Sequence, residues 1–254
     1  MSGSYSILDI APPGSPPPAI GSGRASGPPS DEHPEAWQQS HLIKNPATDE
    51  PGIRTGKAMN RAGGISNISA GGNHTDIVWY SDDLGKSWQV SSARLQGVDE
   101  SSLAELSDGS IFISLRLTAD LKNKPCNCRA YARSQDGGVT WGPIEFSTDL
   151  PASECEGAVA APTEGAGAGK LYFSNPSNAL VRENMTVHSS FDGGKSWPRA
   201  IVVDPGPAAY SSLLPLLGDE VDTLGLLYEH GGTGCPTPLY GNITFVKVPA
   251  VFWE

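Results

Sequence analysis

Three stretches of this chain repeat one eight-residue pattern: Ser81-Asp-Asp-Leu-Gly-Lys-Ser-Trp88, Ser134-Gln-Asp-Gly-Gly-Val-Thr-Trp141 and Ser190-Phe-Asp-Gly-Gly-Lys-Ser-Trp197. Each follows the formula Ser-x-Asp-x-Gly-x-Ser/Thr-Trp, and their first serines are 53 and 56 residues apart. A period in this range is typical of stacked supersecondary units such as the blades of a β-propeller. A β-sandwich would not place three matching corners at one period, so the repeat predicts a propeller.

The parts of the repeat suit the corner of a β-hairpin. The aspartate can accept hydrogen bonds from backbone amides across the turn, and the glycine permits a positive φ. The tryptophan supplies an apolar plate that can be buried against a neighbouring unit. The residues concerned are Asp83, Asp136 and Asp192, then Gly85, Gly138 and Gly194, and finally Trp88, Trp141 and Trp197.

The rest of the chain favours many short strands. Among 254 residues there are 30 glycines and 22 prolines, which interrupt the sequence too often for long helices. No stretch shows a 3.6-residue period, so we expect an all-β fold. The predicted strands are Ile77–Trp79, Ile111–Leu115, Arg129–Arg133, Leu171–Ser174, Met185–Ser189, Ala200–Val203, Leu213–Leu217, Leu224–Glu229 and Ile243–Val248.

The N-terminal part differs in composition. Eight of the prolines fall between residues 11 and 38, with glycine and serine among them. Such a segment has too little apolar surface to offset the entropy lost on ordering. We therefore expect a disordered or polyproline-like leader over residues 1–45 and the propeller region over residues 46–254.

The charge of the chain argues against one class of function, and its targeting signals disagree about the cellular compartment. The net charge is −11 and the pI is about 4.8, which argues against nucleic-acid binding. No apolar run is long enough to cross a bilayer, and no signal peptide is visible at the start. Four Asn-x-Ser/Thr sequons nevertheless point to a secretory compartment, at Asn67, Asn73, Asn184 and Asn242.

Cysteine and histidine give no sign of a metal or cofactor. Cys126 and Cys128 flank one residue, while Cys155 and Cys235 stand alone, which is too few for a disulfide framework. A CxC pair is a weak metal signal without a second cluster nearby. The five histidines form no HExxH pattern. We predict no metal and no cofactor.

The repeat resembles the Asp-box of sialidases (neuraminidases), and the resemblance runs from about Pro51 to the C-terminus. It includes Glu100-Ser-Ser-Leu-Ala-Glu-Leu-Ser-Asp-Gly109 with the following Ile-Phe-Ile-Ser-Leu-Arg116, then Leu171-Tyr-Phe-Ser-Asn-Pro176, and Gly206-Pro-Ala-Ala-Tyr210. The Cys126-Asn-Cys128-Arg element and the Asn184 sequon are most similar to lysosomal animal sialidases. The resemblance implies a six-bladed propeller whose Asp-box aspartates are structural and lie on the outer rim.

The same resemblance implies that the propeller is incomplete here. At about 50 residues per blade, the chain from Ile77 holds about three and a half blades. The family's first blades carry an Arg-Ile-Pro element, with the first of three arginines that clamp the substrate carboxylate, and a loop aspartate that acts as general acid/base. No Arg-Ile-Pro occurs in this chain, and Asp9, Asp49 and Asp76 cannot be assigned to the acid/base role.

By resemblance, Tyr210 is the catalytic nucleophile and Glu100 its proton partner. A sialoside carries a carboxylate on its anomeric carbon, so a neutral tyrosine hydroxyl avoids the repulsion that an Asp or Glu nucleophile would meet. Sialidases with a tyrosine nucleophile are a known exception to the two-carboxylate scheme. The alternatives are that Tyr210 is a core aromatic, and that Glu105 takes the place of Glu100 or either is a solvated strand-end carboxylate.

Arg116 and Arg182 match the other two clamp arginines. Arginine suits that task because its planar fork donates two parallel hydrogen bonds and stays charged. The alternatives are a surface cap for Arg116 and a loop charge for Arg182. No role is predicted for Glu229.

The predicted function is exo-α-sialidase activity: hydrolysis of terminal sialic acids from glycoproteins, oligosaccharides and gangliosides with retention of configuration. The alternative is a truncated, non-catalytic sialic-acid-binding paralogue. A third option, an Asp-box propeller with unrelated chemistry, is weakened by the ordered set of Glu100, Arg116, Arg182 and Tyr210. Sialylated glycans are the expected partners, and any protective partner protein is unspecified. The resemblance implies a lysosomal or membrane-associated protein, whereas the visible N-terminus by itself implies a cytoplasmic one.

Overall fold

The computed structural model describes residues 7–9, 62–70, 73–82, 87–118, 124–231 and 241–250. This part of the chain is built from β-strands, with one 3₁₀ turn at Gly218–Glu220. The expectation of an all-β fold is therefore confirmed for the described residues. None of their helices is long and apolar enough to cross a membrane.

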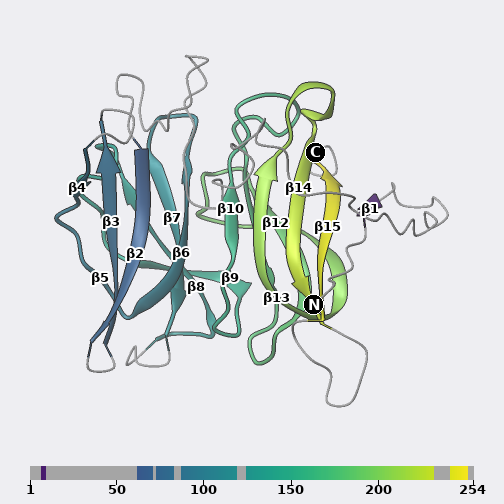
Figure 1. Ribbon diagram of the computed structural model, residues 1–254, viewed down its shortest axis with the longest axis horizontal. Coiled ribbons are helices and arrows are strands. Elements are labelled where there is room, and N and C mark those ends of the chain that lie inside the picture. Colours follow the sequence, from purple (N-terminus) through teal and green to yellow (C-terminus); the bar gives the residue numbers. More distant parts are fainter. Residues whose placement is uncertain are drawn as a thin grey trace.

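The strands form three sheets (Figure 1), in which most strands pair with their neighbours in sequence; the exceptions are β1, which pairs with β15, and β5, which pairs with β3. The first sheet contains β2 (Ala62–Ala70), β3 (Asn73–Ser81), β4 (Gln89–Val90) and β5 (Leu95–Gln96). The second is an antiparallel meander of β6 (Val98–Glu105), β7 (Ile111–Leu117), β8 (Cys128–Ser134) and β9 (Glu145–Pro151).

The third sheet has seven strands in the order β1-β15-β14-β13-β12-β11-β10. Its strands are β10 (Ala158–Ala160), β11 (Leu171–Pro176), β12 (Glu183–Ser190), β13 (Arg199–Pro215), β14 (Thr223–His230), β15 (Asn242–Pro249) and β1 (Ile7–Asp9). All of these pair antiparallel except β1, which runs parallel to β15. One strand thus forms inside the segment predicted as a disordered leader, and the rest of residues 1–45 lies outside the described residues.

Strand β13 divides the seven-stranded sheet into two four-stranded halves. Its first part pairs with β12 up to Pro207, and its second part pairs with β14 from Ala208 onward. The sequence predicted two separate strands here, Ala200–Val203 and Leu213–Leu217, and Pro205-Gly206-Pro207 lies between them. That prediction was wrong, since the backbone stays extended through the prolines while changing partners, and Asp204 accepts the Gly206 amide at 2.7 Å.

Apolar clusters fill the spaces between successive four-stranded units. One lies between the first and second sheets and includes Val78, Val98 and Ile113. The next joins the second sheet to β10 and β11 through Phe112, Phe173 and Trp197, and the last lies around β12, β13 and β14. This stacking of similar units agrees with the period of the repeat.

The second and third repeats form the predicted turns. Asp192 Oδ1 accepts the amides of Lys195 and Ser196, each at 3.0 Å, and Ser190 Oγ accepts the amide of Gly194 at 2.7 Å. Asp136 accepts the amide of Thr140 at 2.9 Å in the same manner. The glycine is required most clearly at Gly194, where φ is 89° and a Cβ would lie 2.4 Å from Phe112 Cε2. Asp83 and Gly85 of the first repeat lie outside the described residues.

The three tryptophans differ in burial. Trp197 is 5% exposed and meets Phe112 and Phe173 edge-on, and Trp141 is partly buried against the first cluster. Trp88 is 45% exposed and contacts Trp79 of its own sheet. The prediction that every repeat buries its tryptophan against a neighbouring unit was therefore wrong for Trp88, since no described unit precedes its sheet.

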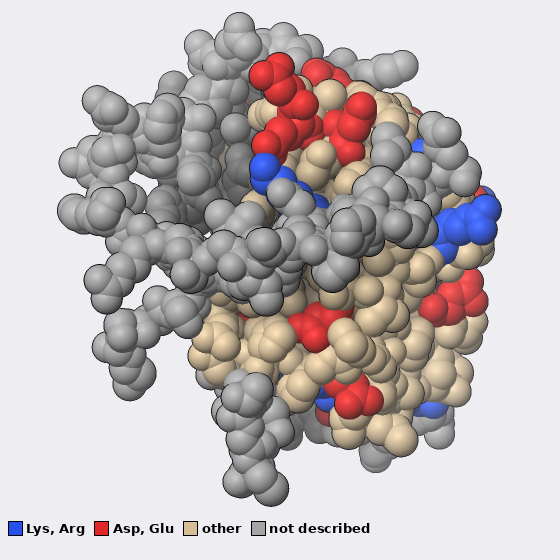
Figure 2. Space-filling model, turned by 90° about the vertical axis from the view of Figure 1, so that its right-hand side faces the viewer, with Lys and Arg blue, Asp and Glu red and all other residues tan. Residues whose placement is uncertain are grey.

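The acidic side chains and the cysteines are unevenly placed. Figure 2 shows acidic side chains gathered in the upper part of one face, in keeping with the net charge of −11. Cys126 and Cys128 form a disulfide, and Cys155 is a buried free cysteine. Among the described residues, no three His, Cys, Asp or Glu side chains are grouped to hold a metal ion.

The burial of the repeat tryptophans predicts graded losses of stability. We expect Trp197→Ala to lower the free energy of unfolding by about 3–5 kcal/mol, because the cavity opens among Phe112, Phe173 and Leu171. Trp88→Ala is the matched control and should change it by less than about 1 kcal/mol. Equilibrium urea unfolding measures both. Equal losses in the two variants would contradict the difference in packing between Trp197 and Trp88.

A buried histidine predicts a loss of stability in acid. His188 in β12 is 4% exposed, and burial lowers its pKa to about 4 from an ordinary value of 6.5. The unfolded chain therefore binds a proton that the folded chain rejects as the pH falls from about 6.5 to 4, and stability falls with it. We expect this histidine to account for about 3 kcal/mol. Urea unfolding at pH 7 and pH 4.5 should show a smaller pH dependence in His188→Leu than in the unaltered chain; equal dependence would disprove the assignment.

Candidate active site

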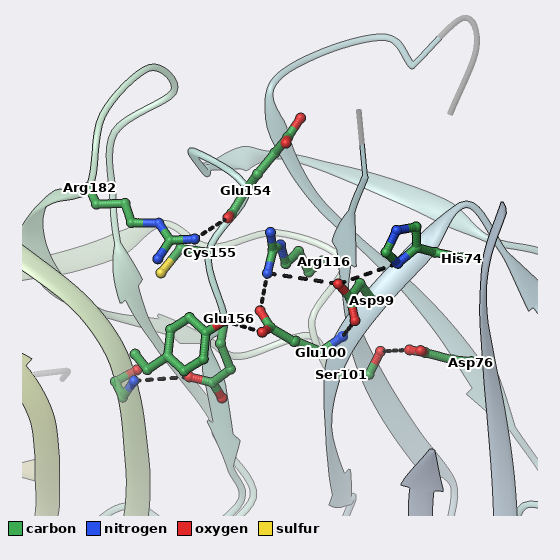
Figure 3. Close-up of polar contacts among 12 residues, drawn as sticks. His74, Asp76, Asp99, Glu100, Ser101, Arg116, Glu154, Cys155, Glu156 and Arg182 are labelled. Carbon is green, nitrogen blue, oxygen red and sulfur yellow. Dashed lines mark hydrogen bonds and ion pairs between the residues drawn. The ribbon is translucent and has the colours of Figure 1, made fainter. Parts of the chain in front are cut away.

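The centre of the site is a hydrogen bond between two of the predicted residues. The Tyr210 hydroxyl, on β13, donates to Glu100 Oε1 on β6, and Arg116 Nη1 on β7 donates to Glu100 Oε2. One carboxylate thus receives a phenol and a guanidinium from two different sheets. Figure 3 shows the side chains of Glu100, Arg116 and Asp99 pointing toward one another from neighbouring strands.

Both residues of this hydrogen bond lie where a strand departs from regular register. Glu100 falls within the shift between Asp99 and Ser102 of β6, and its φ is 37°, in the left-handed region that glutamate rarely adopts. Tyr210 falls within the shift between Ala208 and Ser211 of β13. A β-bulge re-aims a side chain that would otherwise alternate across the sheet. The two bulges therefore turn Glu100 and Tyr210 toward each other.

Arg116 is held by acidic groups on the adjacent strand. Besides Glu100, it lies 3.9 Å from Asp99 Oδ2, and Asp99 is its cross-strand partner. Burial alone lowers the pKa of Arg116, but the hydrogen bond and charge of Glu100, with the charge of Asp99, outweigh it and raise the pKa above its ordinary value. His74 Nδ1 lies 3.6 Å from Asp99 on the other side. Arg116 is thus a fixed cation inside the site.

Arg182 lies on the opposite side of Tyr210. Its guanidinium carbon is 5.6 Å from the centre of the Tyr210 ring, and Nη2 donates to the Glu154 carbonyl at 3.0 Å. The turn before it is ordered by Asn178, whose Oδ1 accepts the amides of Leu180 and Val181 at 2.8 and 3.2 Å. The structure therefore brings together all four predicted site residues, with Arg182 contacting Tyr210 rather than Glu100.

The environment of Tyr210 keeps its hydroxyl protonated. Burial and the hydrogen bond to Glu100 raise the pKa of Tyr210 to about 12, while Arg116 and Arg182 act in the opposite direction. A phenol with such a pKa is neutral near pH 7, so it becomes a nucleophile only as a base removes its proton. Glu100 is the base in contact with it.

Sequence reasoning missed the residues that hold the backbone around Tyr210. Glu229 on β14, for which no role was predicted, accepts the Tyr210 amide at 3.1 Å, and Glu156 accepts the Ser211 amide at 2.9 Å. Arg129 on β8 is fully buried and donates to the Cys155 carbonyl at 2.8 Å. The only sequence signal available was the presence of charged residues next to apolar strands.

Burial sets the protonation behaviour of two of these groups. Burial raises the pKa of Glu156 to about 7, against the opposing effects of the Ser211 amide and the charge of Arg129. It also lowers the pKa of Arg129 to about 10, against the favourable charge of Glu156.

The other candidates from the sequence have different partners. Asp76 on β3 is fully buried and accepts a hydrogen bond from Ser101 Oγ on β6, so its carboxylate links the first sheet to the second. Glu105, the alternative to Glu100, lies at the far end of β6, where it lines a separate cavity with Leu106 and Lys170. The side chain of Asp9 and all of Asp49 lie outside the described residues.

The chain matches known proteins over much of its length. A family model described as BNR repeat-like domain matches residues 27–218. The chain is 37% identical over 169 residues to a sialidase of Micromonospora viridifaciens, covering 65% of this chain and 25% of that protein. It is 32% identical over 158 residues to a sialidase of Bacteroides fragilis, covering 60% of this chain and 28% of the relative.

Solved structures show the same fold. The Hadza microbial sialidase Hz136 superposes with a TM-score of 0.62 at 23% identity, covering 79% of this chain and 37% of that one. The intramolecular trans-sialidase from Ruminococcus gnavus gives a TM-score of 0.60 at 20% identity, with 78% and 42% covered. The chain spans about a quarter of the length of the two curated relatives.

Proposed function

This chain belongs to the family of BNR repeat-like domains, and we propose that its site is that of an exo-α-sialidase, which removes terminal sialic acids with retention of configuration. The observation that carries the proposal is that the Tyr210 hydroxyl and Arg116 both donate to the Glu100 carboxylate, while Arg182, in the turn before β12, lies against the Tyr210 ring. The sialidases among its relatives support the same activity.

The proposed reaction follows from the chemistry of these groups. The Tyr210 hydroxyl attacks the anomeric carbon while its proton passes to Glu100, with which it is already hydrogen-bonded. A neutral nucleophile suits a substrate whose own carboxylate adjoins the reacting carbon. The bond to the leaving oxygen breaks as the bond to Tyr210 forms, and the leaving oxygen takes a proton from solvent. Water then attacks the anomeric carbon from the face that the leaving group vacated and gives a proton to solvent, while the Tyr210 oxygen leaves and takes its proton back from Glu100. Two inversions give retention.

Arg116 and Arg182 supply positive charge on either side of Tyr210. In this proposal both donate to the carboxylate of the sialic acid, for which a guanidinium offers a planar pair of donors. Arg116 would then share its charge between Glu100 and the substrate. Two fixed cations in a chain of net charge −11 would also draw an anionic sugar toward this point of the surface.

The proposed substrates are sialylated glycoproteins, oligosaccharides and gangliosides, and the proposed whole assembly is a six-bladed propeller. A lysosomal or membrane-associated setting is proposed from the sequence resemblance. The Cys126–Cys128 disulfide supports an oxidising route to that compartment. A non-catalytic sialic-acid-binding paralogue is the second candidate. It is favoured by one observation: among the described residues, Asp76 accepts a hydrogen bond from Ser101 and Asp99 lies between Arg116 and His74, so both carboxylates already have partners.

The proposal predicts a substrate-dependent activity for the 254-residue chain. Among the described residues, no side chain is assigned as the acid that protonates the leaving oxygen. General acid catalysis is worth about 10²–10⁴-fold in rate, so we expect poor cleavage of sialyl-lactose. An aryl sialoside should show residual cleavage, because its leaving group needs little protonation. Tyr210→Phe should abolish that cleavage. Tyr131→Phe is the matched control, since Tyr131 also donates to a glutamate, Glu145, away from the site. Release of the aryl alcohol measures the rates.

Three outcomes decide between the candidates. Cleavage by the unaltered chain that disappears in Tyr210→Phe but persists in Tyr131→Phe supports the enzyme. Binding of a sialic-acid-like glycal without any cleavage supports the binding paralogue. Undiminished cleavage by Tyr210→Phe would overturn the assignment of the nucleophile.

The geometry of Arg182 predicts a loss of affinity in its lysine variant. Arg182→Lys should weaken binding of a sialic-acid-like glycal by at least about tenfold, because lysine keeps the charge but cannot donate bidentately. Arg199→Lys, an exposed position at the start of β13, is the control and should bind as the unaltered chain does. Isothermal titration calorimetry gives both dissociation constants. Equal constants for all three proteins would remove Arg182 from the binding site.

A further inference from the structure

We propose that Glu156 is a positioning residue, which holds the strand segment that carries Tyr210 by accepting the backbone amide of Ser211. This inference rests on the proposed function, because it concerns the orientation of the proposed nucleophile. Glu156 lies in the segment just before β10 and does not contact the Tyr210 hydroxyl in the described structure. It acts on Tyr210 through the backbone.

The need for such a residue arises from the bulge in β13. Regular pairing with β14 stops at Ala208 and resumes at Ser211. The amides of Tyr210 and Ser211 instead donate to carboxylates: Tyr210 to Glu229 Oε2 at 3.1 Å and Ser211 to Glu156 Oε2 at 2.9 Å. Two glutamate side chains, one on β14 and one in the segment before β10, therefore take the place of the backbone acceptors of the β-ladder at the position of the proposed nucleophile. Glu229 holds one side of the bulge and Glu156 the other.

The segment that carries Glu156 is itself fixed at several points. The Glu154 carbonyl accepts Arg182, and the Cys155 carbonyl accepts the buried Arg129. Gly157 follows, and a Cβ there would lie 2.5 Å from Phe173 Cζ and 2.7 Å from the Ser174 carbonyl oxygen. The segment thus passes against β11 with no room for a side chain. An anchored backbone gives the Glu156 carboxylate a fixed position from which to hold Ser211.

Charged side chains of both signs surround Glu156. Arg129 provides the opposite charge, while Glu100 and Glu229 are the like charges that face it. Figure 3 shows Arg182 beside Glu154 and Cys155, in the segment that leads to Glu156. A buried amide that loses its acceptor keeps the full cost of desolvation, so the bulge should relax when Glu156 is shortened. A displacement of about 1 Å at a reacting group can cost about 10²-fold in rate.

The test follows one turnover of covalent chemistry at Tyr210 in the full chain. The probe is 2,3-difluorosialic acid, whose anomeric C–F bond breaks as a C–O bond to Tyr210 forms. Fluoride leaves with the electron pair of the broken bond, and the phenol proton passes to Glu100. Fluoride needs little protonation, so the step does not depend on a general acid. Peptide mass spectrometry gives the extent of labelling against time and probe concentration.

The variants separate positioning from general disruption. We expect Glu156→Ala to lower the maximal labelling rate by about 10- to 100-fold with the half-saturating probe concentration unchanged. Glu156→Gln keeps a carbonyl oxygen for the Ser211 amide and should stay within about threefold of the unaltered chain. Glu164→Gln, the same change at an exposed loop glutamate, is the matched control. Glu156→Asp, one methylene shorter, serves if the alanine variant does not fold, and should label slowly.

Failure of this inference differs from failure of the proposed function. No labelling of Tyr210 in the unaltered chain would overturn the proposed function. Labelling of the unaltered chain with an equal rate in Glu156→Ala or Glu156→Asp would overturn only the role of Glu156. Equal slowing in Glu156→Gln and Glu156→Ala would also overturn it, because the hydrogen bond to Ser211 would then not be what positions Tyr210.

Discussion

The hydrogen bond from the Tyr210 hydroxyl to the Glu100 carboxylate joins residues 110 positions apart, and the features of the site follow from what is needed to make it. Each partner lies in a strand that breaks register, in β6 between Asp99 and Ser102 and in β13 between Ala208 and Ser211. In a strand with regular pairing, successive side chains point to opposite faces of the sheet, so the positions of Glu100 and Tyr210 along their strands would determine the faces to which they point. The bulges release them from that rule, and the flanking sheets hold the released segments in place.

The surroundings of this hydrogen bond alternate in charge. Glu100 is paired with Arg116, and Glu156 is opposed in charge by Arg129, while Glu229 accepts the Tyr210 amide. Buried charges are tolerated only where they are paired and hydrogen-bonded. The pairing with Arg116 therefore stabilises the Glu100 carboxylate, which is the proposed proton acceptor, in a protein whose net charge is negative. The arrangement also leaves two guanidinium groups beside the Tyr210 ring or its partner.

The sequence predicted the parts that local chemistry determines. The turns at Asp136 and Asp192 follow from motif residues that bond within eight positions, and they formed as expected. Glu100, Arg116, Arg182 and Tyr210 came from the family resemblance, and the structure brings them together. Trp88 and the continuous β13 were mispredicted, because burial depends on a neighbouring unit and strand continuity on two different partners. Glu156 and Glu229 were missed, because a carboxylate acceptor is needed there only where a distant strand leaves its amides without ladder partners.

Strand β13 has a consequence for how this architecture can be inherited. Its first part completes the unit of β10–β12, and its second part opens the unit of β14 and β15. A boundary drawn between those two units would cut a continuous strand and expose both new ends. Genetic exchange or duplication of the last unit alone would thus have to carry part of the preceding one. The two units are expected to pass between proteins as a single module, with Tyr210 at its joint.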